Sequence, residues 1–279
     1  MSHATSTSTS LVTLKAHFGF ITEPFSKEIA TKSLFLSAQL KGLFERLRLF
    51  IGRRGIALIT GEVGSGKSTA VRAFADTVDK NQHALVYIDN PTLGVRGMFN
   101  NVARQLNLNA PFFKWQLVSE LKAAIEKNFT DYHKTTLLII DDAQHLRPQA
   151  LDELRLLTNF HIDSKAPLSL ILLAQPEFRT IVQLKALEAF RQRLTVRIHL
   201  TGLAQDEAGA YVKHQLEVAG RTDMLFTDEV ITEIYQQAKG IPRLINTLCY
   251  ECLLEIYQQH KNLVDMPTLE KVLCQYDNW

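Results

Sequence analysis

The chain has 279 residues, 46% of them hydrophobic, and a formal net charge of only +2 at pH 7. This length and composition are enough for one or two domains with a buried core. The small net charge argues neither for nor against nucleic acid as a partner. The longest strongly apolar run, at residues 168–174, is far too short to cross a bilayer, so we expect a soluble, cytoplasmic protein with no part in a membrane.

The chain is expected to have three parts. The first ten residues are rich in Ser and Thr and carry neither an apolar signal core nor a charged leader, which predicts a disordered tail at residues 1–17. Strand-like and helical patterns alternate through residues 18–202, as in an α/β core. Residues 203–279 show helical patterns only, and we predict a separate helical lid there.

Short apolar runs in the core predict five strands, at residues 56–60, 84–88, 137–141, 168–174 and 196–200. Helical periodicity predicts one helix before the first strand, at residues 36–51, and others between the strands, at residues 69–75, 95–106, 114–128, 149–160 and 177–190. This alternation predicts a five-stranded parallel sheet with right-handed crossovers and helices on both faces. In such a sheet the ligand binds at the carboxyl ends of the strands.

A loop of the pattern G-x-x-x-x-G-K-S joins the first predicted strand to a helix. Glycines let the backbone N–H groups turn inward around phosphates, and the helix N-terminus adds the positive end of its dipole. A chance glycine-rich turn would lack the Lys-Ser pair and this strand–helix setting. We expect Lys67 to reach the β- and γ-phosphates of ATP and the Ser68 hydroxyl to bind Mg²⁺. The predicted nucleotide-binding residues are Gly61, Glu62, Val63, Gly64, Ser65, Gly66, Lys67, Ser68 and Thr69.

Two adjacent carboxylates follow the four apolar residues 137–140 of the third predicted strand, a pattern that fits a central strand buried on both faces. We expect Asp141 to hold Mg²⁺, usually through water, because this ion prefers hard oxygen ligands and keeps much of its hydration shell. Asp142 is placed to polarise the attacking water. If the glycine-rich loop were not present upstream, the two adjacent aspartates would also fit a helix N-cap or a turn.

Further candidates for catalysis lie after the fourth strand and in the lid. Gln175 is placed to contact the γ-phosphate or the attacking water, although its amide could instead cap a helix. Arg243 follows Pro242 at a predicted helix start, where Pro is favourable but a cation opposes the helix dipole. A bound phosphate would hold such an arginine, so we predict that Arg243 senses the γ-phosphate. The alternative is a surface salt bridge.

Two arginines precede the fifth predicted strand, at an end of the core that faces a neighbouring subunit in this architecture. One of them could reach across the subunit interface as an arginine finger and stabilise charge on the transferred phosphoryl group. We favour Arg193 over Arg191, and either could equally be a solvated arginine at a helix end.

Cys249 and Cys252 have the spacing of a metal-binding pair. They fall within an apolar pattern of helical period and no second ligand pair is nearby, so we expect them to pack as small apolar side chains.

Taken together, these motifs resemble the AAA+ ATPases of the ExeA/GspA type and their relatives among the transposition regulators of the TniB, TnsC, MuB and IstB type. The resemblance runs from about residue 18 to residue 260. Its most specific pieces are Ala174-Gln175-Pro176-Glu177 and Gly240-Ile241-Pro242-Arg243-Leu244-Ile245-Asn246, and the others are Glu23-Pro24-Phe25, residues 60–68, Ile140-Asp141-Asp142-Ala143-Gln144 and Gln192-Arg193.

The resemblance implies a Mg²⁺-dependent ATPase that forms homo-oligomers, either rings or helical filaments. It also implies that Pro24 and Phe25 lie near the adenine and that Pro242 belongs to the nucleotide site. One residue departs from the family pattern, because the second acid is usually Glu and is Asp142 here. A carboxylate that is one methylene shorter reaches its water less well, so hydrolysis is expected to be slow, as suits a switch.

Among these relatives, the chain's end directly after the lid and the lack of an apolar span favour a transposition regulator. In this hypothesis ATP-bound subunits assemble on double-stranded DNA and recruit a transposase. Thr92, Arg96 and Lys114 are the candidate contacts to the DNA backbone, with a solvated loop as the alternative. Two other hypotheses stay open: a secretion or assembly ATPase that binds protein partners without DNA, and a signalling NTPase that does not polymerise.

Overall fold

A computed structural model of the chain describes residues 14–27, 29–109, 111–161 and 165–276. These residues form two compact units. The sheet unit consists of Leu40–Val63 and Lys67–Leu200. The helical unit consists of Gly64–Gly66 and the described parts of Met1–Gln39 and Thr201–Trp279.

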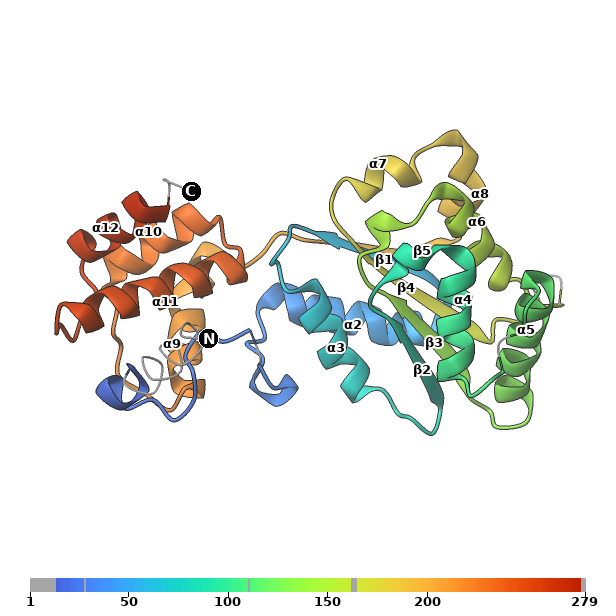
Figure 1. Cartoon of the computed structure of the whole chain (residues 1–279), viewed down its shortest axis with the longest axis horizontal. Helices are drawn as coiled ribbons and strands as arrows, with labels where there is room; N and C mark the ends of the chain where they lie inside the picture. Colours follow the sequence, from blue (N-terminus) through green and yellow to red (C-terminus); the bar gives the residue numbers. More distant parts are fainter. Residues whose placement is uncertain (1–13, 28, 110, 162–164, 277–279) are drawn as a thin grey trace, which may run out of the picture. The chain divides into compact units, whose positions relative to one another are not determined.

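Five parallel strands form the centre of the sheet unit, in the order β2-β3-β4-β1-β5 (Figure 1). Three of them are buried along almost their whole length, because they are flanked by strands and covered on both faces. The predicted five-stranded parallel sheet is confirmed. The strands are β1 (Gly55–Gly61), β2 (His83–Ile88), β3 (Thr135–Ile140), β4 (Leu168–Ala174) and β5 (Leu194–Leu200).

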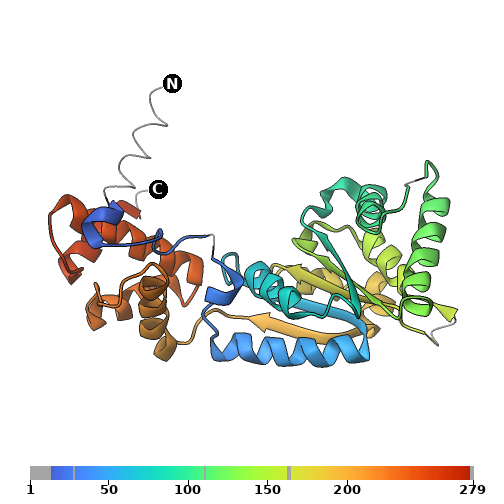
Figure 2. The same cartoon turned by 90° about the horizontal axis from the view of Figure 1, so that it is seen from below.

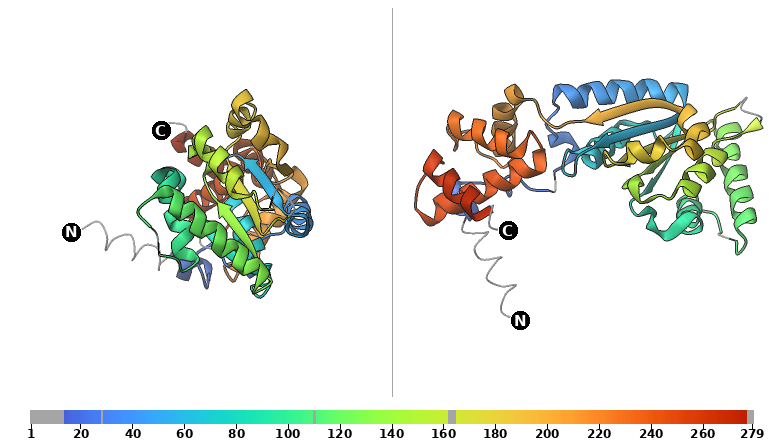
Figure 3. Two further views of the ribbon diagram at one scale, coloured as in Figure 1. Left: turned by 90° about the vertical axis from the view of Figure 1, so that its right-hand side faces the viewer. Right: turned by 90° about the horizontal axis from the view of Figure 1, so that it is seen from above.

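Alternate side chains of the strands enter two different cores. Leu138 and Ile140 of β3 pack on one face against residues of α4, α5 and α6, whereas Leu137 and Ile139 pack on the other face against α2 and α3. Figures 2 and 3 show α2 lying along its face of the sheet. The helices are α2 (Ala38–Arg53), α3 (Lys67–Thr77), α4 (Gly94–Gln105), α5 (Lys114–Thr130) and α6 (Pro148–Leu157).

The helix predicted at residues 177–190 is broken into three short pieces. These are α7 (Phe178–Val182), the 3₁₀ turn η5 (Lys185–Leu187) and α8 (Glu188–Gln192). The Arg191 guanidinium donates to the carbonyl of Gln183 at the end of α7, at 3.1 Å. It thereby satisfies one of the carbonyls that a helix end leaves without an intrahelical partner.

Helices α9 to α12 of the helical unit share one apolar core. They are α9 (Ala208–Val218), α10 (Asp228–Ala238), α11 (Pro242–Gln258) and α12 (Met266–Tyr276). Cys249 and Cys252 are fully buried in it, and burial raises the pKa of both thiols. Within the described ranges, no cluster of His, Cys, Asp and Glu could hold a metal ion. The prediction that this cysteine pair packs as apolar side chains is confirmed.

The N-terminal segment packs into this same core, which differs from the predicted division of the chain. Residues 14–18 are helical, and Leu14, Phe18 and Phe20 are buried against the C-terminal helices. Arg221 anchors the segment by donating to the carbonyl of Phe18 at 2.6 Å. Burial of these apolar side chains is what orders residues 14–17. The rest of the predicted tail, residues 1–13, lies outside the described residues.

No described helix combines the length and the apolar character needed to span a membrane.

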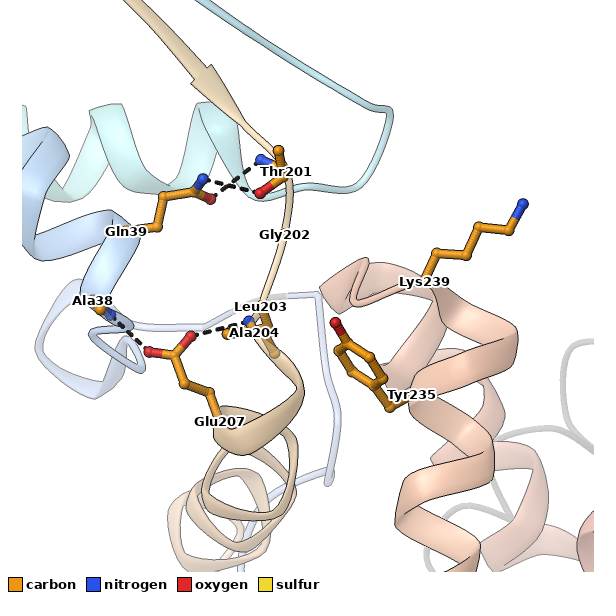
Figure 4. Close-up of a pocket in the computed structure, with 9 residues that line it drawn as sticks. All are labelled: Ala38, Gln39, Thr201, Gly202, Leu203, Ala204, Glu207, Tyr235 and Lys239. Atoms are coloured by element: carbon orange, nitrogen blue, oxygen red, sulfur yellow. Dashed lines mark hydrogen bonds between the residues drawn. The ribbon is translucent and has the colours of Figure 1, made fainter.

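Two polar side chains brace the start of α2 within the helical unit, along a shallow cleft (Figure 4). The Gln39 amide pairs with both the backbone N–H and the hydroxyl of Thr201. The Glu207 carboxylate accepts the backbone N–H of Ala38 at 2.7 Å and that of Ala204 at 3.2 Å. Ala38 begins α2, so Glu207 supplies the acceptor that the first turn of a helix lacks.

Replacing Glu207 by Ala removes the acceptor of two backbone N–H groups at once. We expect Glu207→Ala to lower the free energy of unfolding by about 1 kcal/mol, as measured by urea denaturation. Asp206→Ala, at the exposed neighbouring position, is the matched control and should leave the midpoint unchanged. Equal effects of the two substitutions would show that the brace contributes nothing.

Candidate ATP-binding and hydrolysis site

The phosphate loop connects β1, which ends at Gly61, to α3, which begins at Lys67. Gly64 and Gly66 have φ values of +85° and +90°, which L-residues with a side chain rarely adopt. These two glycines let the loop turn its N–H groups inward at the N-terminus of an 11-residue helix. The predicted strand–loop–helix setting is therefore present.

Lys67 and Ser65 bring their polar atoms into the loop. The Lys67 ammonium donates to the carbonyls of Gly61 at 2.6 Å and Glu62 at 2.8 Å, and its side chain is almost fully buried. The hydroxyl of Ser65 is buried and has no hydrogen-bond partner among the described residues. Buried polar atoms are normally paired, so an acceptor such as a phosphate oxygen fits this position. The loop therefore suits a triphosphate chemically.

Asp141 follows β3, where the carboxyl ends of the parallel strands meet, and is only 8% exposed. Its Oδ2 accepts the phenolic O–H of Tyr87 at 2.9 Å, and its Oδ1 accepts the N–H of Asp142 at the same distance. Burial of the phenol, and then the charge of Asp141, raise the pKa of Tyr87, so the phenol remains a donor at neutral pH. Two donors thus fix the carboxylate that is predicted to hold Mg²⁺.

Tyr87 was missed by sequence analysis. It lies one residue before the end of β2 and is paired in register with Ile139 of β3. A phenol at the penultimate position of the neighbouring strand is the signal that could have revealed it. Ser68, the other predicted Mg²⁺ ligand, lies in the first turn of α3 with an exposed side chain, and its role stays a prediction.

Asp142 is joined to the end of β4 by the side chain of Gln144. The Gln144 amide donates to Asp142 Oδ1 at 2.9 Å and accepts the backbone N–H of Gln175 at 3.1 Å. Asp142 adopts a left-handed backbone conformation, with φ 49° and ψ 39°, and its carboxylate is exposed. The structure thus brings the predicted base and Gln175 together through a residue that sequence analysis assigned no role.

The predicted arginine-finger candidates lie at the end of α8. Arg191 donates to Gln183 in its own chain, and its carbonyl accepts from Arg197 at 3.0 Å. Arg193 directly follows α8 as its C-cap residue and is partly exposed. Action of either arginine on a neighbouring subunit stays a prediction.

Arg243 lies in the first turn of α11, directly after Pro242, and its backbone N–H donates to the carbonyl of Gly64 at 3.3 Å. A Cβ at Gly64 would lie 2.6 Å from the Cβ of Arg243, so only glycine fits this approach. The guanidinium is exposed and forms no ion pair with any residue that the structure describes. Its function as a phosphate sensor stays a prediction.

Pro24 and Phe25, which the family resemblance places near the adenine, are both buried, and Phe25 belongs to the core of the helical unit. The ring of Phe25 packs edge-on against Phe226, with centroids 6.0 Å apart. The structure thus shows a packing contact for Phe25, and the contact with adenine stays a prediction.

Of the three candidate DNA contacts, Thr92 and Arg96 follow β2 and Lys114 begins α5. Thr92 donates to Asn90 through both its N–H and its hydroxyl, and Lys114 forms an ion pair with Glu153. The Arg96 guanidinium lies 5.0 Å from the centroid of the Phe112 ring. Phe112 also packs edge-on against Phe113, with ring centroids 5.3 Å apart. Four apolar side chains of this part of the chain are strongly exposed, and we call them the aromatic surface: Leu93, Phe112, Phe113 and Trp115.

Residues 51–182, which include the phosphate loop and the acid pair, match the family described as AAA domain. Residues 51–182 form an AAA domain. Over 244 residues it is 32% identical to the general secretion pathway protein A of Aeromonas hydrophila, called GspA below. The match covers 86% of this chain and 44% of GspA, so the chain spans less than half of that relative's length.

Solved structures show the same fold at low identity. Cdc6p from Pyrobaculum aerophilum has a TM-score of 0.67 at 17% identity, covering 86% of this chain and 67% of its own. The Aeropyrum pernix ORC2 protein has a TM-score of 0.68 at 16% identity, and the match covers 90% of this chain and 70% of the ORC2 chain. Domain III of the Thermotoga maritima replication initiation protein DnaA has a TM-score of 0.56 at 16% identity. That match covers 91% of this chain and 98% of the DnaA domain.

These matches confirm the predicted AAA+ fold. The AAA domain match agrees with the predicted ATPase that uses ATP and Mg²⁺. They also support the resemblance to ATPases of the ExeA/GspA type. They do not show the resemblance to transposition regulators, and GspA favours the alternative hypothesis of a secretion or assembly ATPase.

Removing the phenol that holds Asp141 tests the geometry of the predicted Mg²⁺ site. We expect Tyr87→Phe to raise the Mg²⁺ concentration needed for half-maximal ATP hydrolysis about tenfold, since partners of metal ligands typically contribute this much. The control is Tyr132→Phe, an exposed tyrosine for which no such contact is described. An unchanged Mg²⁺ dependence in Tyr87→Phe would rule out this role of the hydrogen bond.

Proposed function

We propose that this protein is an ATP-dependent switch of the GspA type, in which the nucleotide state controls assembly with a protein partner. The observation that carries the proposal is the 32% identity to GspA over 86% of this chain. The chain also has the phosphate loop and an acid pair, Asp141 and Asp142. A transposition regulator remains the second candidate, in which ATP-bound subunits assemble on double-stranded DNA and recruit a transposase.

Different residues of the chain have different roles at the proposed site. Bound Mg·ATP supplies the phosphoryl group to be transferred to water. Lys67 neutralises phosphate charge, Ser65 donates a hydrogen bond, and Asp141 and Ser68 hold Mg²⁺. Asp142 accepts the proton of the attacking water. Its short side chain keeps hydrolysis slow, which gives the ATP-bound state a long lifetime.

Arginines and Gln175 complete the proposed mechanism in a homo-oligomer. Gln175, which follows β4, orients the water or the γ-phosphate. Arg193, with Arg191 as the alternative, acts across the subunit interface on the charge of the transferred group. Arg243 reports the presence of the γ-phosphate to α11, whose first turn is bonded to Gly64 of the loop. The assembly is a ring or a filament, and its location is cytoplasmic.

The aromatic surface supports a protein partner rather than duplex DNA. Exposed apolar clusters of this kind are typical of protein-interaction sites, and aromatic side chains are enriched there. A site that follows the DNA backbone needs several unpaired cations, but Lys114 is already paired with Glu153. Arg96 over Phe112 is the one feature that suits both hypotheses, since such pairs also stack on nucleic-acid bases.

Sedimentation with Mg·ATP, with and without duplex DNA at low salt, separates the two candidates. We expect ATP-dependent oligomers whose sedimentation does not change when DNA is added. Assembly that requires duplex DNA would overturn the proposed function in favour of the transposition regulator.

Lys67→Ala should abolish this assembly and weaken ATP binding by about 10–100-fold, because it removes charge-assisted hydrogen bonds to phosphate. Binding is measured by equilibrium titration with a fluorescent ATP analogue. Lys80→Ala, at an exposed lysine three residues beyond α3, is the charge-matched control and should assemble normally. Normal assembly by Lys67→Ala would mean that nucleotide binding does not drive it.

A further inference from the structure

We propose that Gln144 is a positioning residue for ATP hydrolysis: its amide holds the carboxylate of Asp142 and the backbone at Gln175 in one fixed arrangement. The inference rests on the proposed function, in which Asp142 is the base. It adds a residue that contacts neither water nor nucleotide in that mechanism and acts only through its two neighbours.

The chemistry of the two neighbours fixes which way the Gln144 amide points. A carboxylate can only accept a hydrogen bond, so the side of the amide facing Asp142 must be the NH₂ group. The backbone N–H of Gln175 can only donate, so the side facing it must be the oxygen. The distances of 2.9 and 3.1 Å satisfy both requirements at once. An amide is thus uniquely suited to this position, and a carboxylate in its place would lose one of the two bonds.

The contact leaves the rest of Asp142 ready for its proposed task. Gln144 occupies Oδ1, while Oδ2 accepts no hydrogen bond from the described residues. The Asp142 backbone is also anchored, because its N–H donates to Asp141. A short acid on a left-handed turn therefore has one oxygen fixed and one free for water. Without the amide, the exposed side chain would sample other rotamers and spend less time in reach of its water.

The same amide fixes the start of the segment that follows β4. Gln175 has its backbone N–H bound to Gln144, and its own side chain makes no hydrogen bond within the described residues. A change in the position of Gln175 on contact with phosphate would therefore reach Asp142 through one side chain. This is a physical connection between a phosphate-sensing position and the base, made across strands β3 and β4.

Two substitutions separate the two halves of the amide. Gln144→Glu keeps an acceptor for the N–H of Gln175 but places a second carboxylate against Asp142, whereas Gln144→Ala removes both bonds. We expect each variant to lower kcat at least tenfold, because the position of the base affects the chemical step. KM for ATP should stay within about threefold of the wild-type value, because the phosphate loop is intact. Gln149→Ala, at an exposed glutamine in α6, should retain wild-type kcat and KM.

A double-mutant cycle distinguishes positioning from general damage to the fold. In an Asp142→Asn background the base is already lost, so Gln144→Ala should change kcat less than twofold. If Gln144 merely supported the fold, Gln144→Ala would lower kcat by the same factor in the wild-type and the Asp142→Asn background, and that result would overturn the proposal. A wild-type kcat in Gln144→Glu would also overturn it.

Amide hydrogen exchange of the nucleotide-free protein tests the contact without any turnover. The N–H of Gln175 should exchange at least tenfold faster in Gln144→Ala and at the wild-type rate in Gln144→Glu, which retains the acceptor. Unchanged exchange in Gln144→Ala would disprove the contact. If the wild-type protein bound ATP but did not hydrolyse it, the proposed function would fail, while the exchange result would still decide whether the amide holds Gln175.

Discussion

All five strands of the sheet run in the same direction, and this constraint brings the candidate site together. Parallel strands present their carboxyl ends at one edge. The phosphate loop leaves β1 there, the acid pair leaves β3, and Gln175 leaves β4. The order β2-β3-β4-β1-β5 puts β4 between β1 and β3, so that Gln175 lies between loop and acids. An antiparallel arrangement of any one of these strands would remove its residue from the edge.

At this edge, charged and polar groups are held by hydrogen bonds that the sheet and loop supply. The Lys67 ammonium is bound by carbonyls of its own loop, and the Asp141 carboxylate accepts from Tyr87 and from the backbone of Asp142. Groups oriented before the ligand arrives need little rearrangement when it binds, which is the basis of electrostatic preorganisation. The buried hydroxyl of Ser65 has no partner among the described residues, so a phosphate oxygen can accept its hydrogen bond.

The sequence was sufficient for the features that depend on local backbone geometry and on periodicity. A loop that requires positive φ favours glycine, as at Gly64 and Gly66, and a fully buried strand is mostly apolar, as in β3 and β4. The loop, the acid pair and the parallel sheet were therefore predicted from residue types alone. The same periodicity identified Cys249 and Cys252 as core residues.

Features that depend on long-range side-chain contacts could not be predicted in this way. Tyr87 and Asp141 are 54 positions apart, Gln144 and Gln175 are 31 apart, and Arg221 reaches back 203 positions to the N-terminal segment. Which side chain meets which depends on strand register and rotamer, and neither is encoded in a local pattern. For the same reason only the structure reveals that Lys114 pairs with Glu153. This ion pair makes Lys114 a weaker candidate for a DNA contact.

The central claim is that this edge of the sheet binds the triphosphate of ATP. The most direct test is an experimental structure of the protein with Mg²⁺ and a non-hydrolysable ATP analogue. We expect the triphosphate inside residues 61–68, with the Ser65 hydroxyl bonded to a phosphate oxygen and Mg²⁺ between the phosphates and Asp141. An analogue bound at another place, or a loop whose Ser65 hydroxyl and Lys67 ammonium do not contact phosphate, would contradict the account.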